Sequence, residues 1–168
     1  MPTTFIVPDL ELNNRMTRVL FIVKHLSYNR LGKAVLTIDK IAMYDFLIQH
    51  PFILHSVLKD LNKNIEFTLQ SEEINSISKE YPNTSGIYVY KELKQVLQIL
   101  LVFEFIDAGL TENNLAVYNI SKLGREFLDD FSTDYSFRLN EIAEAIVPLQ
   151  PQSFRNLVSY IKPYTNGF

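Results

Sequence analysis

The three histidines are the first candidates for chemistry, because imidazole is the side chain that most often binds zinc or transfers protons near neutral pH. They are His25, His50 and His55. His50 and His55 flank Pro51 at a spacing that matches neither H-x-x-x-H nor H-E-x-x-H, the helical patterns that place two ligands on one face. We therefore predict structural or surface roles for the histidines, with no bound metal and no cofactor.

Other residue types that carry catalysis also form no recognisable site. Cysteine is absent, which excludes disulfides, thiolate metal sites and thiol nucleophiles. The glycine patterns of phosphate-binding loops and the G-x-S-x-G turn of hydrolases are absent too. Glu72 and Glu73, like Asp129 and Asp130, are adjacent and would point apart on a helix. We predict that the chain is not an enzyme, with an uncharacterised hydrolase as a third alternative to the two functions given below.

Asp45 is the acid whose position most needs an explanation. It lies in the apolar segment from Ile41 to Pro51, where a carboxylate requires a compensating partner. Arg15, Arg18 and Lys40 are the candidate partners. We predict that Asp45 forms a structural ion pair and does not act as a catalytic acid.

Composition predicts one folded, mainly helical unit. The 168 residues are 47% hydrophobic, and glycine (5) and proline (7) are too scarce for a typical all-β fold. The N-terminal sequence MPTTFIVPDLEL lacks the basic and apolar regions of a signal peptide. The densest apolar run, Ile99 to Ile106, is far shorter than the roughly 20 residues of a membrane span. We expect a soluble, cytoplasmic protein that does not contact a membrane.

Hydrophobic periodicity places a series of helices along the chain. The expected helices are 14–28, 38–49, 51–61, 71–81, 90–108, 121–131, 135–147 and 151–160, with short strands at 34–37 and 65–69 and a hairpin within 110–120. The 90–108 helix is expected to end at Gly109. The loop 81–86 is the clearest boundary. It separates a basic N-terminal helical part (1–85) from a helix–hairpin–helix part (86–131), which C-terminal helices (132–168) follow, and we expect all three to pack as one compact unit.

The segment from Tyr118 to Leu128 carries the strongest fold signal. It fits the pattern Y-x-[LI]-[TS]-x-x-G-R-x-[FL], in which the second strand of a wing runs directly into a capped helix. Ser121 would end the strand and cap the helix, while Gly124 would let the helix approach the sheet. Following a long apolar helix and a hairpin, this segment resembles the end of a winged-helix domain. The predicted fold class is therefore mainly α with a small β wing, in a winged-helix-like helical domain.

The charge distribution distinguishes protein partners from DNA. Residues 13–63 contain eight Lys or Arg against three Asp or Glu, whereas residues 91–130 contain four against seven. An acidic wing region favours a protein partner, because DNA binding requires a basic surface. If the chain does touch nucleic acid, the candidate contacts are Lys122, Arg125, Arg15 and Arg18.

The apolar surplus of the 90–108 helix gives a candidate partner-binding surface. Its outer side is expected to include Val102, Phe103 and Ile106. The alternative is that this helix is buried on all sides within its own domain.

One stretch resembles a known family. Residues 17–54 read TRVLFIVKHLSYNRLGKAVLTIDKIAMYDFLIQHPFIL and contain the pattern L-x-[IL]-x-K-[IL]-x-x-x-[DH]-F-[IL]-[IL]-x-x-P. The residues that carry it are Leu36, Ile38, Lys40, Ile41, Tyr44, Asp45, Phe46, Leu47 and Pro51. The stretch resembles the middle components of bacterial ABC-three-component systems, the class that includes Lamassu-type anti-phage defence.

This resemblance implies a small non-enzymatic adapter between an SMC-like or ABC-type ATPase and an effector protein. Catalysis would then belong to the partners, and DNA would be contacted within the complex if at all. The alternative function is a winged-helix transcriptional regulator that binds DNA as a dimer.

Overall fold

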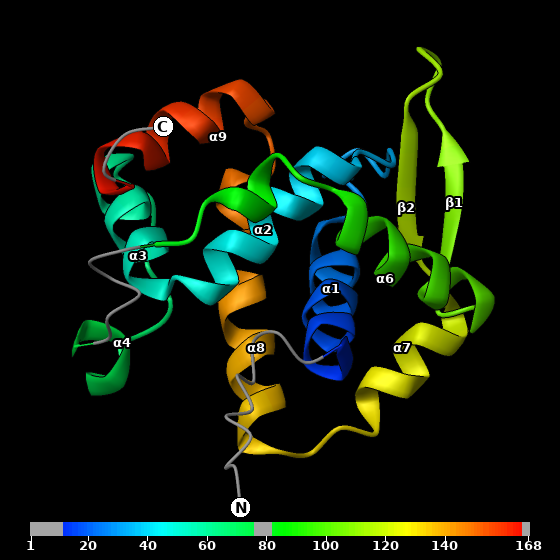
Figure 1. Cartoon of the computed structure of the whole chain (residues 1–168), viewed down its shortest axis with the longest axis horizontal. Helices are drawn as coiled ribbons and strands as arrows, with labels where there is room; N and C mark the ends of the chain where they lie inside the picture. The colour runs from blue at the N-terminus through cyan, green and yellow to red at the C-terminus, as the bar shows by residue number, and fades with distance from the viewer. Residues whose placement is uncertain (1–11, 76–81, 166–168) are drawn as a thin grey trace, which may run out of the picture.

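The computed structural model describes residues 12–75 and 82–165 (Figure 1). The elements are α1 (Leu12–Leu26), α2 (Ile38–Gln49), α3 (Pro51–Asp60), α4 (Ser71–Asn75), the 3₁₀ turn η2 (Ser85–Ile87), α6 (Lys91–Val102), β1 (Ile106–Leu110), β2 (Ala116–Ile120), α7 (Lys122–Asp129), α8 (Asp134–Ala145), η3 (Val147–Leu149), α9 (Phe154–Ile161) and η4 (Lys162–Tyr164). This order confirms the predicted mainly helical fold with a small β wing. No helix in these two ranges is long and apolar enough to cross a membrane.

Helix α1 is the element around which the others pack. It contacts α2, α6, α7, α8 and β2, and in Figure 1 it lies between α8 on one side and α6 with the hairpin on the other. Its consecutive residues 18–23 are all buried, which a helix shows only when neighbours cover several of its faces. The apolar run from Val19 to Val23 is therefore explained by enclosure on several sides.

Pro51 divides the next helical region in two, as predicted. Helix α2 ends at Gln49, and Pro51 occupies the first turn of α3, where its missing N–H has no helical partner to lose. His50 lies between them, with its Nδ1 2.7 Å from the carbonyl oxygen of Phe46 and its ring stacked on the Phe46 ring. Both contacts hold the His50 side chain against the last turn of α2, at the point where the two helices separate.

The wing is an antiparallel hairpin in which Ile106 pairs with Ile120 and Leu110 with Ala116. On its other side β2 meets the segment after α1, because the Tyr118 N–H donates to the Leu36 carbonyl at 3.0 Å. The order across this small surface is thus the Leu36 segment, then β2, then β1. The N-terminal part of the chain and the hairpin are therefore packed together, and the hairpin is not a separate appendage.

Two predicted elements are wrong, and a third, the strand expected at 34–37, is present only as an isolated bridge between Tyr28 and Ala34. The helix expected over 90–108 ends at Val102, and Gly109 lies within β1 instead of at a helix end. Glu104 adopts a left-handed conformation with φ of 59°. Its N–H donates to Leu101 and the N–H of Phe105 donates to Leu100, which is a Schellman motif formed without glycine. The strand expected at 65–69 is irregular chain.

Two other expected segments fall partly outside the described residues. The helix expected over 71–81 is described only as α4, Ser71–Asn75, and its remaining residues 76–81 lie outside. The loop expected over 81–86 is described from Pro82 onward and passes into η2.

One buried apolar cluster extends through the molecule. It includes Leu20 of α1, Leu100 of α6 and Leu149 after α8, so it draws on all three predicted parts of the chain. Gln150 links two distant segments at this core. Its Nε2 donates to the carbonyls of Leu26 at 2.8 Å and Tyr28 at 2.9 Å. The end of α1 is thereby tied to the region that follows α8.

Candidate partner-docking surface

Large apolar side chains are exposed where α6 ends. Val102 is 81% exposed and Phe103 is 54% exposed, so two of the three predicted partner-binding residues lie on the surface. The third, Ile106, is only 1% exposed and cannot contact a partner in this conformation. The reason is the Schellman turn at Glu104, which ends the helix and turns the first residue of β1 toward the core.

Phe103 begins a row of four aromatic rings that sequence reasoning missed. The phenylalanine row consists of Phe103, Phe105, Phe127 and Phe131, whose successive ring centroids lie 5.7, 4.4 and 5.0 Å apart. Phe103 and Phe127 are exposed, and the other two are partly buried. The four-residue spacing of Leu123, Phe127 and Phe131 would have revealed the α7 half of the row.

The phenylalanine row is held in place by the start of α7. The Ser121 hydroxyl accepts from the Gly124 N–H at 2.9 Å and donates to the Glu104 carbonyl at 2.6 Å. A Cβ on Gly124 would lie 2.1 Å from the Phe105 carbonyl oxygen, so only glycine permits this approach. The predicted roles of Ser121 and Gly124 are thus confirmed, and both fix Phe127 against Phe105.

Two open hollows adjoin the phenylalanine row. One, of about 550 Å³, lies between α1 and α6 and is lined by Leu12, Val102 and Phe103 among others. The second, of about 320 Å³, lies between α1 and α7 and includes Phe127 and Phe131. The row therefore connects two concave surfaces, an arrangement that can accept side chains of another protein.

Acidic side chains border the phenylalanine row. Glu104, Glu126 and Asp130 are exposed and directly adjacent in sequence to residues of the row, and Asp129 is exposed on the same helix. Two lysines pair weakly with this group: Lys122 Nζ lies 3.7 Å from Glu126, and Lys24 Nζ lies 3.6 Å from Asp129. Lys122 and Arg125, two of the predicted nucleic-acid contacts, are exposed on α7 among these acids.

Of the other two predicted nucleic-acid contacts, Arg18 is buried and cannot contact DNA in this conformation, whereas Arg15 keeps 17% of its side chain exposed. Arg18 is 1% exposed, and its Nε donates to Asp45 Oδ1 at 2.8 Å. Burial acts to lower the pKa of Arg18, but the Asp45 carboxylate, with a smaller contribution from Tyr135, offsets this, so the pKa is raised. Arg15 lies 3.7 Å from Asp45 and donates to Glu92 at 2.8 Å. The predicted structural ion pair of Asp45 is confirmed.

Lys40, the third candidate partner of Asp45, has a different role. Its Nζ donates to the Gln150 carbonyl at 3.0 Å. Burial lowers the pKa of Lys40.

The ion pairs line a small polar cleft of about 200 Å³ between α1, α2, η2 and α6. Its four charged residues are Arg15, Arg18, Asp45 and Glu92, and their charges neutralise one another. Across residues 12–75 and 82–165, no three His, Asp or Glu side chains converge in a way that could hold a metal ion.

The histidines contribute to packing. His25 Nε2 lies 2.9 Å from Asn140 Oδ1, which joins α1 to α8. His55 packs edge-on against Phe67 with ring centroids 6.1 Å apart, which attaches the irregular chain after α3.

The comparison with protein families decides the classification. The model of the family described as ABC-three component (ABC-3C) system Middle Component 4 matches residues 26–159, most of the chain. The chain belongs to this family. A search of curated proteins and a search of solved structures each gave no match.

As a Middle Component 4 protein, the chain is one component of a multi-protein system and is not itself that system's ATPase. The matched residues run from the end of α1 into α9, and they include α6, the hairpin and α7. The whole phenylalanine row therefore lies within the family's part of the chain.

Proposed function

We propose that this Middle Component 4 protein is a non-enzymatic adapter that links an SMC-like or ABC-type ATPase to an effector in a bacterial anti-phage defence complex, working in the cytoplasm. The observation that carries the proposal is the exposed apolar end of α6, where Val102 and Phe103 face solvent on a component of a multi-protein system. Contiguous apolar surface rimmed by polar residues is characteristic of protein-interaction sites, because leaving it in water is unfavourable.

The charged residues agree with a binding role. Arg15, Arg18, Asp45 and Glu92 are committed to one another, and Arg138 binds Glu73 at 2.6 Å and Glu141 at 2.6 Å. These charged side chains form ion pairs within the fold that stabilise the contacts between its elements, and an adapter needs such a stable fold.

Co-expression with the proteins encoded by neighbouring genes tests the adapter function. We expect the chain to co-elute with the ATPase and with the effector in size-exclusion chromatography. We also expect immobilised ATPase to retain the effector at least about tenfold better when the chain is present, as two linked binding events predict. If neither neighbour forms a complex, or if the ATPase retains the effector equally well without the chain, the adapter function is wrong.

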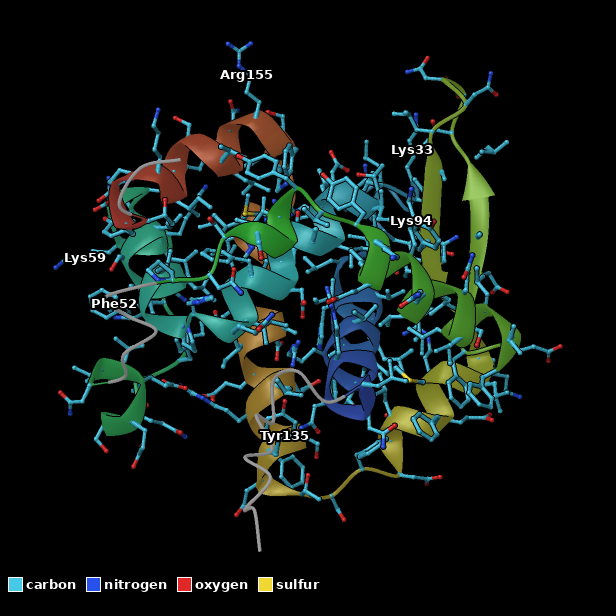
Figure 2. All side chains as sticks on the ribbon, in the orientation of Figure 1. Lys33, Phe52, Lys59, Lys94, Tyr135 and Arg155 are labelled. Atoms are coloured by element: carbon cyan, nitrogen blue, oxygen red, sulfur yellow. The ribbon has the colours of Figure 1, made fainter. Side chains whose placement is uncertain are left out.

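A DNA-binding regulator remains the second candidate, and one observation favours it. The outer face of α6 is polar, with Lys91, Lys94, Gln95 and Gln98 exposed. Lysine and amide side chains on one helix face are groups that can contact DNA phosphates. Figure 2 shows Lys94 on α6, and Lys33, on the side of the molecule that carries the hairpin.

The second candidate predicts salt-dependent binding to duplex DNA from the upstream region of its own gene, measured by mobility shift. Replacing two phosphate contacts in Lys91→Glu/Lys94→Glu would weaken binding and reduce its salt dependence. A flat titration of the unmodified protein at low salt would exclude this function.

A further inference from the structure

We propose that the phenylalanine row receives an α-helix of a partner protein whose apolar face is bordered by lysine or arginine side chains. This inference rests on the proposed adapter function and adds the chemistry of the partner. It follows from the spacing of the rings, the charge around them and the rigidity of their support.

The spacing of the rings fits a helix. Successive centroids lie 4.4–5.7 Å apart, close to the 5.4 Å pitch of an α-helix. Neighbouring rings are therefore in contact, and the row is a continuous apolar strip along which side chains at positions i, i+4 and i+7 of a partner helix can pack. The hollows beside Phe103 and Phe127 provide room for the largest of those side chains.

The border of the row selects a basic partner. The turn before β1, helix α7 and its C-cap carry four Asp or Glu (Glu104, Glu126, Asp129 and Asp130) against two Lys or Arg (Lys122 and Arg125). Glu104, Glu126 and Asp130 are exposed beside the rings. An amphipathic helix with lysine or arginine flanking its apolar face would place opposite charges against this border, which favours encounter and fixes orientation.

The same charges argue against a second copy of this chain as the occupant. In a two-fold symmetric contact the same acidic patch would meet itself, so acids of one copy, such as Glu104 and Asp130, would lie near acids of the other. Like charges brought together at an interface are unfavourable. A partner of opposite charge therefore suits this surface better than self-association.

Contacts within the chain fix the backbone that carries the phenylalanine row. Ser121 and Gly124 fasten α7 onto the turn between α6 and β1, and the Schellman motif fixes Phe103 relative to Phe105. Because the backbone that carries the rings is already fixed, binding does not have to order it, and this limits the conformational entropy lost at this surface.

Substitution in the row is the first test, made on the full chain in its complex with ATPase and effector. Val102→Ser/Phe103→Ser removes the two most exposed apolar side chains and should lower the affinity for one partner about tenfold or more. Phe137→Ser is the matched control, because Phe137 is 61% exposed on α8 outside the row. Thermal unfolding followed by circular dichroism confirms that both variants fold. Equal affinity of the row variant and the control would overturn the proposal.

Charge reversal is the second test. Glu104→Lys/Asp130→Lys should weaken the same association about tenfold at low salt and reduce its salt dependence. Glu144→Lys, an exposed change on α8, is its control and should have no effect. Unchanged or tighter binding by the double variant would show that the partner is not basic.

Site-specific crosslinking identifies the occupant directly. With a benzophenone amino acid at position 102 of the full chain in the complex, we expect a crosslink to a partner helix that carries lysine or arginine beside apolar positions. A crosslink to a second copy of this chain, or to an extended segment, would overturn the proposal. Failure to form any complex would overturn the adapter function too, whereas an intact complex insensitive to all these changes would overturn the docking site alone.

Discussion

Arg18 and Asp45 bring opposite charges into the core, where each compensates the other for the loss of water. Removing one member of a buried pair leaves an uncompensated charge, which typically costs about 3–5 kcal/mol. We therefore expect Asp45→Ala to lower the free energy of unfolding by about that amount, measured by urea titration with circular dichroism. Glu144→Ala, at an exposed position, should change it by less than about 0.5 kcal/mol.

Replacing both members of the pair separates the cost of an unpaired buried charge from the cost of lost packing. Arg18→Met/Asp45→Leu removes both charges and should be less destabilising than Asp45→Ala alone. A loss below about 1 kcal/mol for Asp45→Ala would mean that the ion pair does not support the core.

The burial of Tyr44 leads us to expect that the stability of the protein depends on pH. It is fully buried, and its hydroxyl has no hydrogen-bond partner among the described residues. Burial, with a smaller contribution from the charge of Asp39, raises its pKa above the ordinary value of 10.0. The folded state then holds the proton at pH values where the unfolded state releases it, so stability falls as pH rises above about 10.

Tyr44→Phe tests this. Without the unpaired hydroxyl, the free energy of unfolding at pH 7 should rise by about 1 kcal/mol, and its decline above pH 10 should become shallower. Urea titrations at pH 7 and 10.5 measure both effects, with Tyr28→Phe, at an exposed ring, as the control. A destabilised variant at pH 7 would contradict the prediction.

Arg15 and Arg18 show which properties of single residues can be predicted from the sequence. A carboxylate at Asp45 in an apolar segment demanded a partner, and both arginines were correct candidates. The same arginines were also predicted as surface contacts, because they lie off the apolar stripe of α1. Only the packing of α2 against α1, a contact between distant segments, shows that they are enclosed.

At the scale of elements, the junction of α7 with the turn before β1 has no room for a larger side chain at Gly124. In Gly124→Ala the new Cβ would press on the Phe105 carbonyl oxygen, and relieving the overlap must move α7 or the turn. We expect a loss of about 1–3 kcal/mol in the free energy of unfolding. Gly86→Ala is the control, since a Cβ there meets nothing within 4 Å. Equal stability of the two variants would show that the approach at Gly124 is not needed.

The end of α6 shows why element boundaries were harder to predict than elements. The hairpin and α7 have local signals, a turn around Asn114 and a Ser121 cap, and both were predicted. The run from Ile99 to Ile106 has no glycine or proline, so its sequence reads as continuous helix. The left-handed turn at Glu104 packs against Ser121 and Gly124, which lie much later in the chain. The phenylalanine row, assembled across this turn, could not be predicted without it.

For the whole molecule, the continuous core predicts cooperative folding. Helix α1 of the N-terminal part packs on α6, α7, α8 and β2 of the later parts, so neither half buries its apolar faces alone. We expect a single unfolding transition that coincides in circular dichroism and tyrosine fluorescence. A fragment of residues 1–85 should be unfolded by itself. Two separate transitions, or a folded fragment, would show that the predicted parts are independent domains.

Gln150 has a consequence for how the protein is made. The amide that closes the end of α1 comes from a residue 124 positions after Leu26 and 122 after Tyr28. During synthesis from the N-terminus, water must solvate those carbonyls until Gln150 has left the ribosome. The central helix is therefore completed late in translation, and products that terminate before this residue keep an open core that proteases can recognise.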